Sequence, residues 1–139
     1  MSMVNTNDTN ESNETNNEKI IYKELSYRVL ECAYEVHNVL GPGFPENIYE
    51  EAMVRELKRR QICHETQKRI EVSYKGERIG EFRLDLIIEN KIIVELKAVG
   101  ELSKLFEAQL YSYLKATHLK LGILINFGAQ RVESRRVVN

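Results

Sequence analysis

The sequence predicts an α/β domain, a mixed β-sheet flanked by helices in the order α-α-β-β-β-α-β. Three observations lead to this fold class. Two stretches with apolar residues at helical spacing come before any alternating stretch. Two apolar strands, residues 79–88 and 92–97, then follow each other across a tight turn. Finally, a helical stretch leads into a nearly continuous apolar run at residues 120–127, as expected of a strand covered on both faces.

The first two elements are expected to be helices. Residues 20–40 carry an apolar stripe at helical spacing, formed by Ile21, Leu25, Val29, Cys32, Ala33, Val36 and Leu40. A Gly-Pro pair at residues 41–42 ends this helix, because Gly caps a helix end and Pro cannot continue it. The second helix is predicted from Pro45 to about Arg60. It places Glu46 in the first turn, where the helix dipole favours an anion.

Three strands are expected next. Residues 64–74 alternate between polar and apolar side chains, and residues 75–77 form a hairpin turn. The strand at residues 79–88 contains Gly80, which suggests a bulge or a close backbone approach. The strand at residues 92–97 follows after a short turn.

That short turn sets the register of the two strands. An odd-length turn centred on Asn90, a residue that tolerates the left-handed conformation, places Asp85 directly across from Glu95. A two-residue turn would instead put the two carboxylates on opposite faces. We predict the first register, with Lys97 on the same face as Glu95. This register pairs Asp85 with Glu95, Ile87 with Ile93 and Arg83 with Lys97. Alternation along the first strand places three apolar residues together on its opposite face, Leu84, Leu86 and Ile88.

A third helix is predicted over about residues 102–117, with an apolar side formed by Phe106, Leu110, Tyr113 and Leu114. Gln109 and Tyr113 are four residues apart and therefore share a face. A strand, a helix and a buried strand form a right-handed crossover, so the strand at residues 120–127 should lie parallel to the Glu95 strand. Residues 131–138 are interpreted as an edge strand or a frayed C-terminus.

Composition limits the classes of protein and partner. Residues 1–18 contain four acids and no Lys or Arg, and we interpret them as a disordered acidic, Asn-rich tail before a folded domain at residues 19–139. The remainder has 20 basic and 17 acidic residues, so the domain is mildly basic, although the net charge of −1 argues against strong nonspecific nucleic-acid binding. No signal sequence or membrane-crossing run is evident. Cys32 and Cys63 match no metal-ligand spacing and are interpreted as free thiols in a reducing cytoplasm.

The predicted register brings two acids and an amine together. Two carboxylates a few ångströms apart must share a proton, pair with Lys97 or Arg83, or bind a hard divalent cation. Oxygen ligands favour Mg²⁺ or Mn²⁺ over zinc, which prefers nitrogen and sulfur. Lys97 could orient an attacking water or neutralise charge in the transition state. These parts suit hydrolysis of a phosphodiester, although Glu95 and Lys97 taken alone could be only an ion pair on one strand face.

The pattern of Asp85 on one strand and Glu95-x-Lys97 on the next resembles the motif of the PD-(D/E)xK nuclease superfamily. Leu84 stands where the family's proline is usual. Glu46 matches an extra carboxylate that many members use at the metal site.

Two further motifs extend the resemblance. The segment from Gln109 to Tyr113 matches the Q-x-x-x-Y motif of the lambda-exonuclease-like branch, where it supports the catalytic lysine and the DNA. The segment from Gly43 to Tyr49 matches the GxxExxY signature of a small family in this superfamily. The segment from Gly43 to Tyr49 could instead be only a turn, an acid at the start of a helix and a core aromatic. Tyr113 could likewise be a core aromatic.

The resemblance implies a restriction-endonuclease-like core and a Mg²⁺- or Mn²⁺-dependent nuclease that hydrolyses phosphodiester bonds of DNA. The implied catalytic residues are Asp85, Glu95, Lys97, Gln109 and Tyr113, and the implied metal ligands are Glu46, Asp85 and Glu95. One alternative is a non-catalytic module on the same fold that binds nucleic acid or a protein. A further one has the tail and Arg131, Arg135 and Arg136 serving contacts in a homo-oligomer.

Overall fold

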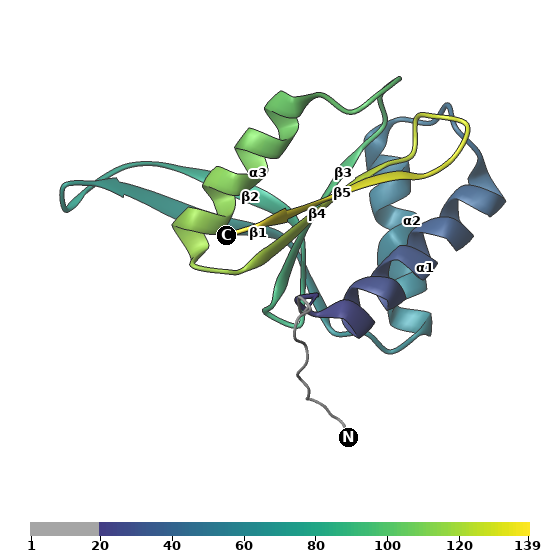
Figure 1. Ribbon diagram of the computed structural model, residues 1–139, viewed down its shortest axis with the longest axis horizontal. Helices are drawn as coiled ribbons and strands as arrows, with labels where there is room; N and C mark the ends of the chain where they lie inside the picture. The colour runs from purple at the N-terminus through teal and green to yellow at the C-terminus, as the bar shows by residue number, and fades with distance from the viewer. Residues whose placement is uncertain (1–19) are drawn as a thin grey trace.

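A computed structural model describes residues 20–139, in which one five-stranded mixed sheet has α1 and α2 on one face and α3 on the other (Figure 1). The elements are α1 (Lys23–Leu40), α2 (Glu46–Arg59), β1 (His64–Tyr74), β2 (Glu77–Ile88), β3 (Ile92–Lys97), α3 (Lys104–Thr117), β4 (Leu121–Asn126) and β5 (Glu133–Val138). The strand order is β1-β2-β3-β4-β5, and β3 and β4 are the parallel pair. The predicted fold class and the parallel crossover are confirmed, and the last segment is an edge strand. The predicted tail at residues 1–18 lies outside the described residues.

The ends of the helices differ from the prediction by a few residues. Helix α1 begins at Lys23 and not at residue 20, because Tyr22 adopts a left-handed conformation with φ of 52°. Pro45 lies just before α2 with φ of −65°, so it precedes the helix and does not occupy its first turn. Glu46 is in that first turn, as predicted.

Two apolar clusters lie on the two faces of the sheet. On the α1 and α2 face, the helix stripes pack against alternate strand residues that include Leu86, Ile88, Val94 and Leu96. On the α3 face, Leu110 and Leu114 pack against Leu84, Ile87, Ile93 and Leu124. A Cβ built on Gly122 of β4 would lie 2.7 Å from Leu110, so α3 approaches the sheet closely at this glycine.

The β1–β2 hairpin projects beyond the rest of the sheet (Figure 1). Its pairing shifts between Val72 and Ser73, which leaves Ile79 as an extra residue beside Gly80. The predicted bulge therefore lies next to this glycine. A bulge increases local twist, and here it lies in the projecting part of the hairpin.

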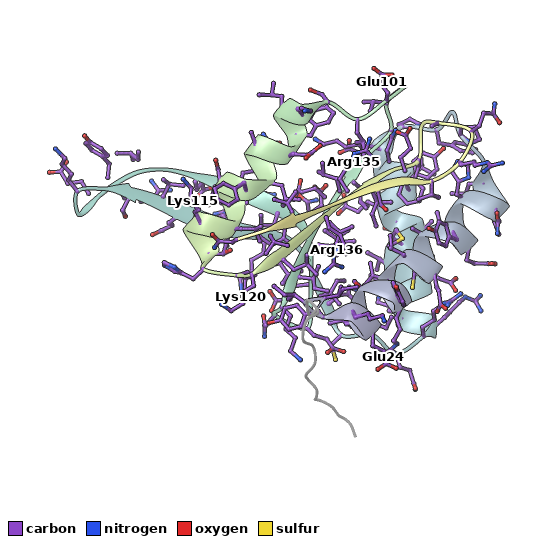
Figure 2. All side chains as sticks on the ribbon, viewed as in Figure 1. Glu24, Glu101, Lys115, Lys120, Arg135 and Arg136 are labelled. Atoms are coloured by element: carbon purple, nitrogen blue, oxygen red, sulfur yellow. The ribbon has the colours of Figure 1, made fainter. Side chains whose placement is uncertain are left out.

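Neighbouring arginines on β5 point to opposite sides of the sheet (Figure 2). Arg135 reaches Glu107 of α3 at 3.9 Å, whereas the Arg136 guanidinium donates to Ser26 Oγ at 3.0 Å and to the Ile21 carbonyl at 2.7 Å. Arg136 thus ties β5 to the start of α1. The hypothesis that it serves contacts between subunits stays a prediction.

Both cysteines are free thiols, as predicted. Cys32 is buried, and burial raises the pKa of its thiol to about 11, while Cys63 is exposed. Within residues 20–139, no helix combines the length and the apolar character needed to cross a membrane.

Candidate active site

The turn between β2 and β3 has the predicted register. Ile88 pairs with Ile92, Ile87 with Ile93 and Leu86 with Val94. Glu89 and Asn90 have φ values of 51° and 57°, so the turn uses two left-handed residues. One step further along this register, Asp85 meets Glu95.

At this point the two strands are joined through carboxylates. The Asp85 backbone N–H donates to Glu95 Oε2 at 3.2 Å, and the Leu96 N–H donates to Asp85 Oδ2 at 3.0 Å. The regular pairing of β2 with β3 ends at Leu86. The predicted pairing of Arg83 with Lys97 is wrong, because the strands no longer form a ladder there and Arg83 pairs with Arg69 of β1.

Glu95 has an unusual electrostatic environment. Its side chain is 7% exposed, and burial followed by the negative charge of Asp85 raises its pKa from 4.5 to about 8. The Asp85 N–H and the Lys97 charge oppose this rise but do not cancel it. The Lys97 charge is therefore too weak to offset burial and the neighbouring carboxylate, which is the condition under which a buried acid holds a proton or takes a cation.

Asp85 reaches this position because the β1–β2 ladder is interrupted beside it. Thr66 pairs with Leu86 and Lys68 with Leu84, but Gln67, which should oppose Asp85, has φ of 52°. The side-chain alternation of β2 changes at the same place. Leu84 joins the α3-face cluster, whereas Leu86 joins the other cluster.

The prediction that Leu84 shares a face with Leu86 and Ile88 is therefore wrong. Strict alternation holds only while the backbone keeps one regular strand conformation, and the interruption at Asp85 breaks it. Gln67 was not singled out from the sequence, and its left-handed backbone has no local signal there. Its amide Nε2 donates to Glu50 Oε2 of α2 at 2.8 Å, which links the interruption to that helix.

The backbone at Gln67 can be tested with two substitutions that both remove the amide. Gln67→Gly should keep the left-handed conformation and leave stability within about 1 kcal/mol of wild type. Gln67→Val should cost about 2 kcal/mol more, because a β-branched residue disfavours positive φ, and should turn Asp85 away from Glu95. Thermal unfolding and Mn²⁺ calorimetry would measure both effects. Equal Mn²⁺ affinity in the two variants would contradict the assigned role.

Lys97 lies beside the two acids with its amine over an aromatic ring. Its Nζ is 4.3 Å from the centroid of the Phe106 ring of α3. In the described part of the chain no ion pair joins Lys97 to Asp85 or Glu95. The interpretation of Glu95 and Lys97 as a plain ion pair is thus not what the structure contains, and the lysine charge faces an open region.

The two residues of the α3 motif, Gln109 and Tyr113, have different surroundings. Tyr113 is half-buried and stacks on Phe82 with ring centroids 4.3 Å apart. Burial and then the charges of Glu95 and Asp85 raise the pKa of its phenol, so Tyr113 is both a core aromatic and a neighbour of the acids. Gln109 is exposed and lines a surface hollow together with Lys97.

Glu46 approaches the acids from the start of α2. Glu46 is exposed at the surface, but partial desolvation and then the charge of Asp85 raise its pKa, and the Lys97 charge lowers it, so the three groups lie within electrostatic range of one another. Tyr49 holds this end of the helix: its hydroxyl donates to the Gly41 carbonyl at 2.5 Å and accepts from the Phe44 N–H at 3.2 Å. Tyr49 thus fastens the turn at Gly41 and Phe44 that leads into the helix carrying Glu46.

Asn126 at the end of β4 fastens the segment after Lys97, a role that the sequence did not reveal. Its Oδ1 accepts from the N–H groups of Val99 and Gly128, and its Nδ2 donates to the Val99 carbonyl and to Glu133 Oε1. The side chain is fully buried, so all four bonds are made away from water. This amide explains why the backbone beyond the Glu95-x-Lys97 motif has a fixed course.

The oxygen donors of the two acids suit a hard cation. Asp85 and Glu95 bring their carboxylates to the same place between β2 and β3, and carboxylate oxygens are typical ligands of Mg²⁺ or Mn²⁺. Within residues 20–139, no three side chains of His, Cys, Asp or Glu already form a cluster that could hold a metal. Glu46 would have to move closer to complete a ligand set.

Comparison with protein families bears directly on this arrangement. A sequence model of the PD-(D/E)XK nuclease superfamily matches residues 23–137. The chain belongs to the PD-(D/E)XK nuclease superfamily. The elements that bring the acids and the lysine together all lie inside the matched region of this PD-(D/E)XK domain.

Among solved structures, the crystal structure of SSO0001 is similar to this PD-(D/E)XK domain, with a TM-score of 0.55 and 21% sequence identity. The match covers 84% of this chain and 58% of that chain, so the present chain spans less than two thirds of that protein. At this identity the likeness supports the restriction-endonuclease-like fold alone. A comparison with curated proteins found no match.

The raised pKa of Glu95 makes the stability of the metal-free PD-(D/E)XK domain depend on pH. Between pH 4.5, the unfolded value, and about 8, the folded state binds more protons than the unfolded state, so stability falls as pH rises. We expect Tm to be lower by at least about 5 °C at the upper end of this window than at the lower end. Glu95→Gln should remove most of this difference, because glutamine stays neutral. Thermal scans would contradict the assignment if both proteins showed the same dependence.

Proposed function

We propose that this chain is a Mg²⁺- or Mn²⁺-dependent nuclease that hydrolyses phosphodiester bonds of DNA. The observation that carries the proposal is the contact between half-buried Asp85 and buried Glu95, each of which accepts a backbone N–H from the other strand, with Lys97 beside them. Membership of a nuclease superfamily supports the same chemistry. The segment from Gly43 to Tyr49 further supports placement in the GxxExxY family.

In this proposal Asp85, Glu95 and Glu46 hold the cation. A bound divalent cation would neutralise the acids and polarise a phosphoryl oxygen. With its acids neutralised, the site can accept the negative charge of a phosphate, which the bare carboxylates repel. The residues of the chain then have separate tasks of binding, orientation and charge stabilisation.

Lys97 supplies the positive charge that is not used for holding the metal. Since its amine forms no ion pair with the two acids, it is free to face a phosphate oxygen and stabilise the charge that develops there. Phe106 limits the positions of the amine by lying under it. Gln109 and Tyr113 would orient Lys97 and the nucleotide from α3.

The second candidate is a non-catalytic binding module on the same fold. The observation that favours it, with a protein as the partner in place of nucleic acid, is the pairing of surface charges on the β1–β2 hairpin, where Arg69 contacts Glu81 and Arg78 contacts Glu71 and Glu81. Such pairs leave few unpaired cations there for a phosphate backbone. A nuclease that engages a short stretch of strand needs fewer such contacts than a protein that grips a long duplex.

Calorimetry with Mn²⁺ and cleavage assays on single-stranded DNA, duplex DNA and RNA test the proposal. We expect Mn²⁺ binding that weakens in Asp85→Ala, and cleavage of DNA that requires the metal. Binding of DNA without any metal-dependent cleavage would favour the module. Absence of both Mn²⁺ binding and cleavage would reject the nuclease.

A further inference from the structure

A hollow of about 490 Å³ opens beside Lys97 along the outer side of α3. Its lining residues are Lys97, Leu105, Phe106, Ala108, Gln109 and Ser112. The volume lies in the range of about 300–1,000 Å³ that holds small organic ligands in proteins. Because Lys97 belongs to both, the hollow is continuous with the region in which the proposed reaction occurs.

The walls of the hollow have two kinds of chemistry. Leu105 is 74% exposed and presents apolar surface next to Phe106 and Ala108. Together these side chains form an apolar wall, against which the face of a flat ring can pack. Gln109 and Ser112 add an amide and a hydroxyl, which can donate to or accept from polar atoms at the edge of a ring.

The positive end of the hollow fixes the direction of its occupant. Among residues 20–139, Lys97 is its one charged lining residue, so a ligand with an anionic group and an apolar ring would place the anion at Lys97 and the ring along α3. A nucleotide unit combines these two parts, an anionic phosphate and a flat base. Its phosphate would lie at the site of hydrolysis, and its base would lie against Leu105 and Ala108.

We propose that this hollow binds an unpaired nucleobase next to the phosphate held at Lys97, so that the substrate is single-stranded DNA. This rests on the proposed nuclease function. A base inside a duplex is stacked and paired and cannot enter a pocket unless it is first extruded. Stacking on apolar and aromatic side chains is tolerant of sequence, so the hollow selects unpaired strands over duplex without selecting a particular base.

The test compares two ligands of equal charge and length: oligothymidylate and a chain of abasic deoxyribose phosphates. Fluorescence anisotropy with Ca²⁺ in place of Mg²⁺ measures binding apart from cleavage. Wild type should bind oligothymidylate at least about tenfold more tightly than the abasic chain, since the apolar surface that one base buries against Leu105 and Ala108 contributes on this order. Equal binding of the two ligands would overturn the proposal.

Two alanine-to-tryptophan substitutions on α3 test whether the preference for oligothymidylate arises in the hollow. Ala108→Trp fills the hollow, whereas Ala116→Trp places the same side chain on an exposed position of the same helix outside it. The first should abolish the tenfold preference for oligothymidylate and the second should keep it. Loss of the preference in both variants, or in neither, would overturn the proposal. Leu105→Gln, which removes apolar wall from an exposed position, should lower the preference even if Ala108→Trp folds poorly.

Cleavage of the same strands with Mg²⁺ separates this proposal from the proposed function. Binding that prefers bases and is lost in Ala108→Trp, without cleavage by wild type, would keep the pocket and reject the nuclease. Metal-dependent cleavage with equal rates on the single strand and the blunt duplex would keep the nuclease and reject the pocket.

Discussion

Replacing Lys97 by methionine should lower the rate of metal-dependent DNA cleavage by at least about 100-fold, since one group that stabilises developing charge is typically worth this much. Methionine keeps an apolar stem over Phe106, so the fold should persist while the charge is lost. Asp85→Asn should lower the rate at least as much, because it removes a charge from the carboxylate pair while keeping an acceptor for the Leu96 N–H.

Mn²⁺ affinity distinguishes the roles of these two residues. It should fall in Asp85→Asn and stay unchanged or rise in Lys97→Met, because only the aspartate is proposed to hold the cation. Lys115 offers a matched control, because its amine also lies near an aromatic ring, 5.3 Å from the Tyr111 ring centroid. It belongs to α3 and lies outside the site (Figure 2). Lys115→Met should cleave at the wild-type rate. A Lys97→Met protein as active as this control would remove the lysine from the mechanism.

Substituting alanine for Gly128 should destabilise the fold by about 3 kcal/mol, at the upper end for overpacking. A Cβ there would lie 2.3 Å from the Val99 carbonyl oxygen, and backbone atoms cannot yield as a flexible side chain does. The clash would push apart the two segments that Asn126 holds together. Since the Phe127 N–H also donates to the Lys97 carbonyl at 2.9 Å, the end of β3 should shift with them.

Urea denaturation would measure this loss against Gly80→Ala. A Cβ at Gly80 would meet no atom within 4 Å, so that variant should unfold within about 1 kcal/mol of wild type. The comparison separates a general effect of replacing glycine from the specific crowding at Gly128. Identical unfolding midpoints for the two variants would show that the loop after β4 has more freedom than its close contacts imply.

Local patterns were enough to predict the turn between β2 and β3. Asn90 tolerates a left-handed backbone, the apolar runs on both sides have equal spacing, and the resulting register pairs Ile87 with Ile93 as expected. The same reasoning failed a few residues away, at Leu84, because it assumed that alternation continues through Asp85. The interruption depends on Gln67 in a third strand, whose conformation the sequence of β2 does not encode.

By itself, the sequence determined the succession of elements, the parallel crossover and the motif residues Asp85, Glu95 and Lys97, because these follow from short-range periodicity and spacing. Tertiary structure alone decided that Leu84 turns to the α3 face, that Lys97 lies over Phe106 without an ion pair to Asp85 or Glu95, and that Asn126 secures the backbone beyond it. The physical reason is that the direction of a side chain at an interrupted ladder depends on every strand and helix packed around it. Periodicity along one strand carries no information about those neighbours.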